Sequence, residues 1–202
     1  MAEPGTPRLV LASGSPRRAA LLARLRWDPE LRPADVDETV HPDEPPQALV
    51  VRLARSKAAA VAVGREDEVV LAADTEVALD GRVLGKPRDD ADAAAMLRSL
   101  AGRTHEVVTG LTVIRGNTSA TDLVTTRVTF RTLTDAEVAW YVGTGEPAGK
   151  AGAYALQDAG AALVERLDGS DTNVIGLPLA ATVALLRTVG LDLLGPAQPT
   201  SP

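Results

Sequence analysis

Three lysines are the least expected charged residues of this sequence. Lys and Arg together number 21, and only Lys57, Lys86 and Lys150 are lysines. Lysine and arginine are not interchangeable where a compact ammonium group must meet a phosphate or a carboxylate. The three positions are therefore candidates for anion binding, although composition alone is equally compatible with chance placement on the surface.

The segment SGSPRR (13–18) is a second candidate for anion binding, because it precedes and opens a predicted helix. Backbone N–H groups at a helix start attract anions, the hydroxyl of Ser13 adds a donor, and Arg17 and Arg18 can clamp phosphate oxygens. An ordinary helix cap followed by solvated arginines is the alternative. Neither a Walker-type spacing nor Gly-x-Gly-x-x-Gly is present in this segment.

A carboxylate, Asp74, directly follows the apolar run 68–73. The run predicts a buried strand, and the carboxyl edge of such strands is where open α/β sheets hold ligands. Asp74 could bind a divalent cation or take a proton from water, and a turn-forming aspartate is the alternative. Asp37 and Glu38 offer a second carboxylate from a loop. One or two carboxylates plus substrate phosphates suffice to hold Mg²⁺.

Two of the lysines lie beside glycines, in the segments GKP (85–87) and KAGAYALQ (150–157). Glycine permits close approach of the backbone to a ligand, whereas a loop tip with a solvated lysine is the alternative. Gln157 can donate and accept hydrogen bonds together, as the reading of a base edge requires. The alternating pattern around His105 favours a core side chain over a catalytic one, and His41 is expected to be exposed.

Apolar periodicity and turn residues predict the elements that must position these side chains. Strands are expected at 8–12, 68–73 and 161–167, and hairpins at Asp80-Gly81 and Gly116-Asn117. Helices are expected after Ser15, from 45–46 onward, and at 89–100, 134–142 and 177–189. The mixture of βα units and hairpins predicts an α/β fold with a mixed, partly antiparallel twisted sheet and flanking helices.

Composition narrows the classes of function. The chain of 202 residues is 45% hydrophobic and 24% charged, as in an ordinary globular protein. A net charge of −6 and five aromatic residues argue against nucleic acid as a partner. The absence of cysteine excludes thiolate chemistry, and no apolar run is long enough to span a membrane or form a signal peptide. We expect a cytoplasmic protein with one domain at 1–194 and a disordered tail at 195–202.

The order of the motifs is more specific than any one of them. They are SGSPRR (13–18), SKA (56–58), AADT (72–75), GKP (85–87), THEVVTG (104–110), KAGAYALQ (150–157) and NVIGLPL (173–179). All three lysines fall inside these motifs. Taken together the motifs strongly resemble the Maf family of nucleotide pyrophosphatases over nearly everything from residue 8 to about 190.

The resemblance implies hydrolysis of a nucleoside triphosphate between its α and β phosphates, with a divalent metal such as Mg²⁺ or Mn²⁺. It also implies a fold with a central cleft, similar to that of inosine triphosphate pyrophosphatases. Asp74 would be the general base or a metal-linked carboxylate, and Glu38 a second metal-linked carboxylate. The phosphates would be held by Ser13, Arg18, Lys57 and Lys86. A homodimer is compatible with the family, although no oligomerisation signature is present.

Three positions resemble the branch of the family that acts on dTTP and UTP: Arg17, Thr75 and Gln157. A few positions depart from the usual pattern, among them Glu76 in place of an aliphatic residue and Asp158 in place of glycine. Asp158 stands beside the residue expected to read the base. The alternatives are a nucleotide-binding regulator of cell division with little hydrolysis, or a pyrophosphatase for 7-methyl-GTP or inosine triphosphate.

Overall fold

The computed structural model describes residues 7–195 of the chain. Its strands are β1 (Arg8–Leu11), β2 (Glu30–Leu31), β3 (Glu68–Leu79), β4 (Arg82–Val83), β5 (Thr104–Arg115), β6 (Thr118–Phe130) and β7 (Val164–Asp168). Its α-helices are α1 (Pro16–Arg24), α2 (Pro46–Ala62), α3 (Asp90–Leu100), α4 (Asp135–Gly143), α5 (Asp171–Ile175) and α6 (Leu179–Arg187). Two 3₁₀ helices are η1 (Ala151–Ala153) and η2 (Ala159–Leu163).

The strands form one seven-stranded sheet in the order β2-β1-β3-β5-β6-β7, with β4 paired to β3 outside this path. β1 pairs in parallel with both β2 and β3. All the other pairs are antiparallel. The predicted mixed, partly antiparallel sheet with flanking helices is therefore confirmed.

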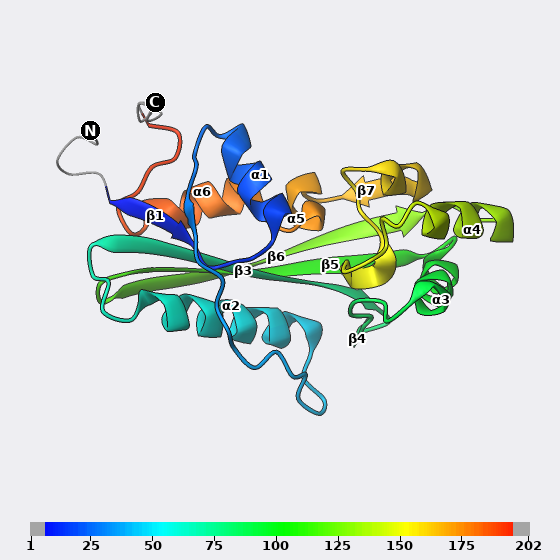
Figure 1. Ribbon diagram of the computed structural model, residues 1–202, viewed down its shortest axis with the longest axis horizontal. Coiled ribbons are helices and arrows are strands. Elements are labelled where there is room, and N and C mark those ends of the chain that lie inside the picture. Colours follow the sequence, from blue (N-terminus) through cyan, green and yellow to red (C-terminus); the bar gives the residue numbers. More distant parts are fainter. Residues whose placement is uncertain (1–6, 196–202) are drawn as a thin grey trace.

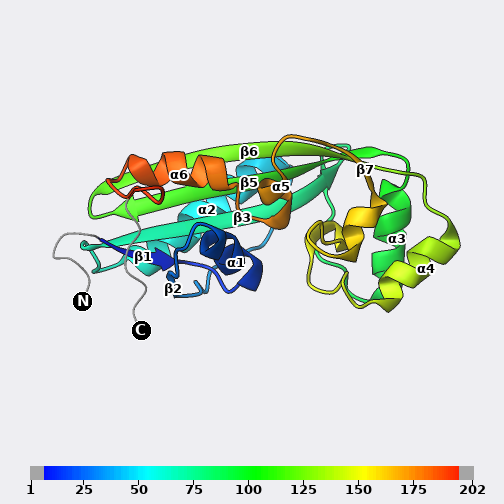
Figure 2. The ribbon, with the colours of Figure 1, turned by 90° about the horizontal axis from the view of Figure 1, so that it is seen from above.

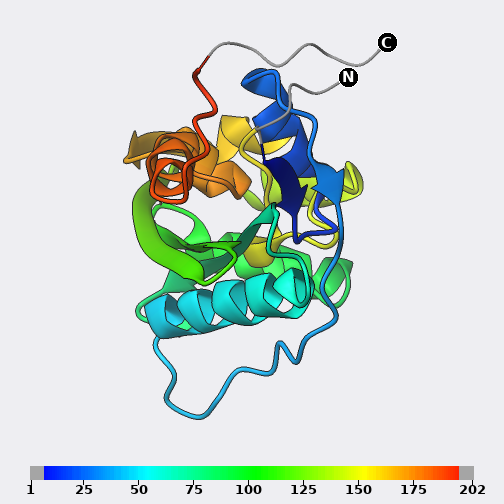
Figure 3. The ribbon, with the colours of Figure 1, turned by 90° about the vertical axis from the view of Figure 1, so that its left-hand side faces the viewer.

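Helices cover both faces of the long central strands. α2 lies along one face, and α1 and α6 lie on the other (Figures 1 and 3). Because side chains alternate along a strand, Leu11 and Leu71 pack in the core under α1 and α6, whereas Val10 and Val70 pack in the core under α2.

A separate core lies at the other end of the sheet, where α3 and α4 pack together (Figure 2). Its largest fully buried side chains include Phe130 and Tyr141. β3 crosses from one core to the other, since Ala73 belongs to the core under α1 and α6 and Val77 to the core beside α3. The polar triplet 74–76 thus lies where the two cores meet.

Several local signals act as the sequence predicts. α1 begins at Pro16, and Thr134 forms a capping box with Glu137 at the start of α4. Asp80 and Gly81 have φ of 51° and 76°, the left-handed backbone that a two-residue hairpin requires between β3 and β4.

Two predicted boundaries are wrong by three residues or more, whereas the ends of β1 and α6 differ from the prediction by one or two residues. β3 does not end at Asp74 but continues to Leu79, because its antiparallel pairing with β5 runs without a break from Val70 to Ala78. β7 begins at Val164 rather than at residue 161, since η2 occupies the preceding segment. Asp74 therefore lies within a strand and not at its carboxyl end.

No helix within residues 7–195 combines the length and the apolar character that crossing a membrane requires. Of the tail expected at 195–202, all but Gly195 lies outside the described residues.

Candidate active site

A cavity of about 400 Å³ opens at an interruption along one edge of β3. β1 pairs with this edge as far as Leu71, and β4 pairs with it from Ala78 onward. Between these points no strand within residues 7–195 pairs with the edge. The interruption lets side chains from both faces of β3 line the same cavity, which explains why Asp74 faces a ligand site from the middle of a strand.

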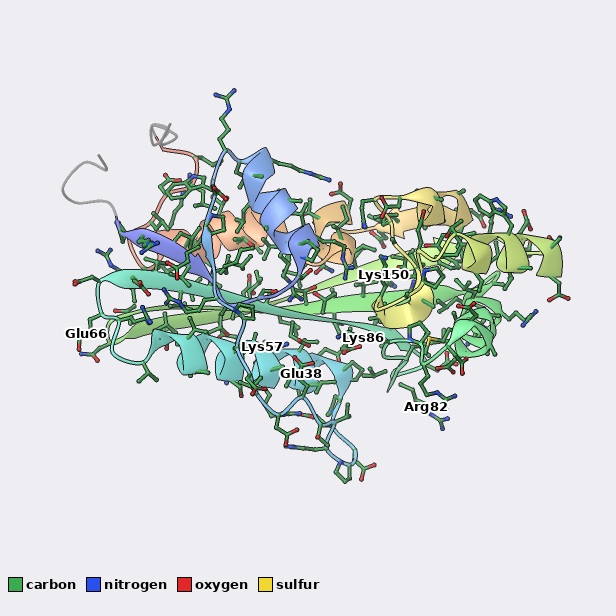
Figure 4. The ribbon with its side chains drawn as sticks, viewed as in Figure 1. Glu38, Lys57, Glu66, Arg82, Lys86 and Lys150 are labelled. Carbon is green, nitrogen blue, oxygen red and sulfur yellow. The ribbon has the colours of Figure 1, made fainter. Side chains whose placement is uncertain are left out.

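Of the site residues that the sequence predicts, all but Asp37, the alternative to Glu38, line this cavity. Its lining includes Ser13, Arg17, Arg18, Glu38, Lys57, Asp74, Thr75, Lys86 and Gln157. Lys150 lines it as well, so all three lysines of the chain meet at one site (Figure 4). Chance placement of lysines on the surface does not account for this convergence.

Lys57 holds two carboxylates together. Its side chain reaches from α2 to the sheet, and its Nζ lies 2.6 Å from Glu38 Oε1 and 2.6 Å from Asp74 Oδ1. Lys57 and Asp74 are only 8% and 7% exposed, whereas Glu38 stands in the open loop before α2. The hydrogen bond from Lys57 lowers the pKa of Glu38, so this carboxylate is anionic at neutral pH.

Asp74 and Glu76 point to the same face of β3, because they are two residues apart in a strand. Asp74 Oδ2 and Glu76 Oε2 are both buried without a hydrogen-bond partner. Burial, reinforced by the charge of Asp74, raises the pKa of Glu76 to about 7. Two residues that line the cavity therefore each carry a carboxylate oxygen that the protein itself leaves unsatisfied.

Arg18 is fixed on the opposite face of β3. Its Nε donates to Gly176 O at 2.8 Å, and its two terminal nitrogens donate to Ser13 Oγ and Thr75 Oγ1 at 3.1 Å each. A guanidinium has five N–H donors, so three bonds leave two donors free. Burial lowers the pKa of Arg18, and the nearby carboxylate of Asp74 opposes that effect.

The mouth of the cavity carries the residues expected to read a base. Gln157 is exposed, and its Nε2 donates to Asp158 Oδ2 at 2.8 Å. Asp158 also acts on Arg17, where its negative charge opposes the lowering of the arginine pKa by burial. Gln157, Asp158 and Arg17 thus form one polar group at the rim.

Glu146 anchors the segment that carries Gln157. Its carboxylate accepts hydrogen bonds from the backbone N–H groups of Ala159 and Gly160, and its backbone carbonyl accepts one from Lys150 Nζ. Gly152 has φ of 68°, and a Cβ there would lie 2.8 Å from Val77 Cγ1. Glycine is therefore required at position 152, where η1 packs directly on β3.

A family model described as "Maf-like protein" matches residues 8–189. The chain belongs to the Maf family. A protein named dTTP/UTP pyrophosphatase from Anaeromyxobacter dehalogenans (strain 2CP-C) is 57% identical over 192 residues, which cover 93% of this chain and 96% of that protein. A protein of the same name from Myxococcus xanthus (strain DK1622) is 54% identical, with coverage of 92% and 94%.

Solved structures with some likeness to this Maf chain include the Ham1 proteins of Staphylococcus aureus and Coxiella burnetii. They are 18% and 16% identical to it, with TM-scores of 0.44 and 0.42. The matched regions cover 61% and 62% of this chain, and 71% and 73% of those chains.

The sequence did not indicate the part played by residues that support the site. Thr109 lies opposite Thr75 in the pairing of β3 with β5, and their hydroxyl oxygens are 2.9 Å apart. Asn173 is fully buried and donates from Nδ2 to Val107 O and Thr126 Oγ1. Both residues lie in Maf motifs, but their roles depend on strand register, which periodicity does not reveal.

The donor set of this Maf site fits a divalent cation. The described residues contain no group of three or more Asp, Glu, His or Cys arranged to hold a metal by themselves. Asp74, whose Oδ2 has no partner, nevertheless lines the cavity together with Glu38 and Glu76. Hard oxygen donors completed by substrate phosphates and water are the usual environment of Mg²⁺.

His105 supports one wall of the cavity from the core, as its sequence pattern predicts. It is buried, its Nε2 lies 2.9 Å from the hydroxyl of Tyr154, and its ring packs edge-on against Phe130. Burial lowers the pKa of His105 to about 4 and raises that of Tyr154, so both groups are neutral at pH 7.

His105 should therefore make the Maf protein sensitive to acid. The unfolded chain takes up a proton near pH 6.5 and the folded chain only near pH 4, so stability present above pH 6.5 is lost as the pH falls through this window. Urea unfolding at pH 7 and at pH 4 measures the decrease in the free energy of unfolding between these two pH values. We expect this decrease to be about 3 kcal/mol smaller in His105→Gln than in the wild type. The exposed His41→Gln serves as the control, and an equal loss in wild type and His105→Gln would contradict the assignment.

Proposed function

We propose that this protein hydrolyses dTTP and UTP to the nucleoside monophosphate and pyrophosphate, and so removes these or modified pyrimidine nucleotides from the nucleotide pool. The observation that carries the proposal is the convergence of Lys57, Lys86 and Arg18 around Asp74, a buried carboxylate with one free oxygen. Relatives 50–57% identical over more than nine-tenths of the chain are named dTTP/UTP pyrophosphatases, which supports the choice of substrate.

The triphosphate would bind among the cationic groups. Arg18 keeps two free N–H donors, and the side chain of Ser15 makes no capping bond at the start of α1, which leaves the first N–H groups of that helix open to an anion. Ser13, Lys57 and Lys86 complete the phosphate-binding set. Thr75 contributes through its bond to Arg18, whose guanidinium it helps to orient.

Asp74 would act as the general base. Lys57 holds its Oδ1, which fixes the carboxylate so that it can orient the attacking water and take a proton from it. The oxygen of that water forms a bond to the α phosphorus, and the bond from this phosphorus to the α–β bridging oxygen breaks. Arg18, Lys57 and Lys86 would stabilise the negative charge that develops on the departing pyrophosphate.

Asp74 and Glu38 would hold the divalent cation, Mg²⁺ or Mn²⁺, that the family resemblance implies. When bound, such a cation neutralises phosphate charge and lowers the pKa of a coordinated water. A regulator that only binds nucleotides would have no use for the free oxygen of Asp74, which favours the enzyme over that alternative. We place this activity in one domain, 1–194, and in the cytoplasm, where the nucleotide pool is.

The direct test incubates the purified protein and Mg²⁺ with dTTP, UTP, CTP, ATP, GTP, ITP and 7-methyl-GTP in separate reactions, and resolves the products by ion-exchange chromatography. We expect monophosphate and pyrophosphate from dTTP and UTP, and no reaction after addition of EDTA. Turnover of 7-methyl-GTP or ITP instead would leave the reaction in place and contradict the choice of base. Nucleotide binding without any turnover would contradict the enzyme.

Substitutions at the rim should alter the choice of nucleotide more than the maximal rate. Arg17→Ala and Gln157→Ala remove side chains that line the mouth of the cavity, while the buried carboxylate and lysine remain in place. We expect the ratio of kcat/KM for UTP over CTP to fall about tenfold, as for the loss of one hydrogen bond to a base. Arg24→Ala, an exposed arginine of the same helix α1, should leave this ratio unchanged. An unaltered ratio in both rim variants would refute the assignment.

A further inference from the structure

We propose that Glu76 is a further ligand for the divalent cation of this site, and that it acts with Asp74 through the oxygen that each carboxylate has free. The inference rests on the proposed function for the presence of the cation. It does not depend on which nucleotide is the substrate.

The position of Glu76 directs its carboxylate to the same space as that of Asp74. The two residues lie on one face of β3, and both line the cavity. Asp74 pairs across the sheet with Gly110, and a Cβ on Gly110 would lie 2.4 Å from the backbone oxygen of Val50 in α2. α2 therefore packs directly on the backbone of β5 and closes the space beside Asp74 on the β5 side. The space beside Asp74 is open on the other side, at the unpaired edge of β3.

Asp74 and Glu76 each have one carboxylate oxygen without a hydrogen-bond partner, which supports a shared cation independently of their position on β3. Asp74 is only 7% exposed, and Asp74 Oδ2 and Glu76 Oε2 are buried without a partner. A buried carboxylate oxygen without a hydrogen bond is costly. One cation bound by both oxygens would satisfy the two groups together, which neither Lys57 nor any other described side chain does.

Lys57 occupies the position between Glu38 and Asp74 where a cation could bridge these two carboxylates. The ammonium group lies 2.6 Å from Glu38 Oε1 and 2.6 Å from Asp74 Oδ1. A cation bridging those same two oxygens would have to take the place of the ammonium, since two positive charges repel at such a distance. Lys57 leaves available Asp74 Oδ2, the carboxylate of Glu76 and the second oxygen of Glu38, while phosphate and water oxygens would complete the coordination.

The experiment measures binding of Mn²⁺ alone to the full-length protein, with free Mn²⁺ followed by electron paramagnetic resonance. Loss of a residue that only hydrogen-bonds to a metal ligand weakens metal binding about 10–100-fold, so loss of a direct ligand in Glu76→Gln should raise the Kd for Mn²⁺ at least about tenfold. Glu66→Gln, an exposed glutamate in the loop before β3, is the matched control and should bind as wild type does (Figure 4). Circular dichroism establishes that each variant is folded, and Glu76→Met replaces Glu76→Gln if the latter unfolds.

An unchanged Kd in Glu76→Gln, or no binding by the wild-type protein up to millimolar Mn²⁺, would overturn the proposal. The outcome is separable from the fate of the proposed function. Weakened Mn²⁺ binding in Glu76→Gln together with an inert wild-type protein would overturn the hydrolysis and leave Glu76 as a ligand. If Glu76→Gln hydrolyses UTP with the same Mg²⁺ dependence as the wild type, the hydrolysis stands and Glu76 is not a ligand.

Discussion

Asp74→Asn is expected to lower kcat for UTP at least about 10²-fold, the range for loss of a general base. Asparagine has nearly the volume of aspartate, and its amide oxygen can still accept the bond that Lys57 donates to Asp74 Oδ1. The substitution therefore removes the proton acceptor and leaves the surrounding contacts in place. Steady-state release of pyrophosphate, measured at saturating UTP, gives the rate.

The matched control for this variant is Asp67→Asn, which changes an exposed aspartate of the loop before β3 and should keep the wild-type rate. A thermal melt should show that Asp74→Asn is folded, because Lys57 keeps Glu38 as an anionic partner, and this would separate a lost base from a lost fold. Turnover by Asp74→Asn within a few fold of the wild type would refute the role given to Asp74.

Lys57→Met should have the second large effect, and on stability as well as activity. Methionine fills the apolar path of the lysine stem but leaves Asp74 as a buried anion without its partner. Removal of one member of a buried ion pair costs about 3–5 kcal/mol, so we expect the free energy of unfolding to fall by about that amount. Urea unfolding at pH 7 measures it, and hydrolysis of UTP should be lost in the same variant.

Two further variants distinguish the ion pair from a general effect of losing a lysine. Lys86→Met removes an exposed lysine of the same cavity and should weaken catalysis without lowering stability. The double variant Lys57→Met/Asp74→Asn should recover much of the stability lost in Lys57→Met, because the uncompensated charge is gone, and should remain inactive. Equal stability of the single and double variants would contradict the role of Asp74 as the partner whose burial depends on Lys57.

The sequence predicts the composition of the site far better than its position in the fold. The residues to which the family resemblance gives a role all line the cavity, and the motifs contain each of them except Glu38. Asp74, however, was expected at a strand end, because the polar triplet 74–76 interrupts the apolar run that precedes it. β3 continues because it pairs with β5, and the residue of β5 opposite Asp74 is Gly110, 36 residues further along the chain.

The wrong strand end also hides the position of Glu76 in the site. Once β3 is known to continue to Leu79, alternation along the strand places Glu76 on the face of Asp74. The unpaired edge between β1 and β4, which lets Thr75 and Asp74 line one cavity from opposite faces, depends on where two neighbouring strands stop. Local signals such as the Asp80-Gly81 turn are encoded within a few residues and were therefore predicted correctly.

In the proposed mechanism, water attacks the α phosphorus of a pyrimidine nucleoside triphosphate in the cavity around Asp74. Hydrolysis of UTP in water enriched in ¹⁸O, followed by mass spectrometry of the products, identifies the phosphorus that is attacked. We expect one ¹⁸O atom in UMP and none in pyrophosphate. Label in pyrophosphate would place the attack on the β phosphorus, and labelled orthophosphate with UDP would place it on the γ phosphorus; either result would contradict the mechanism.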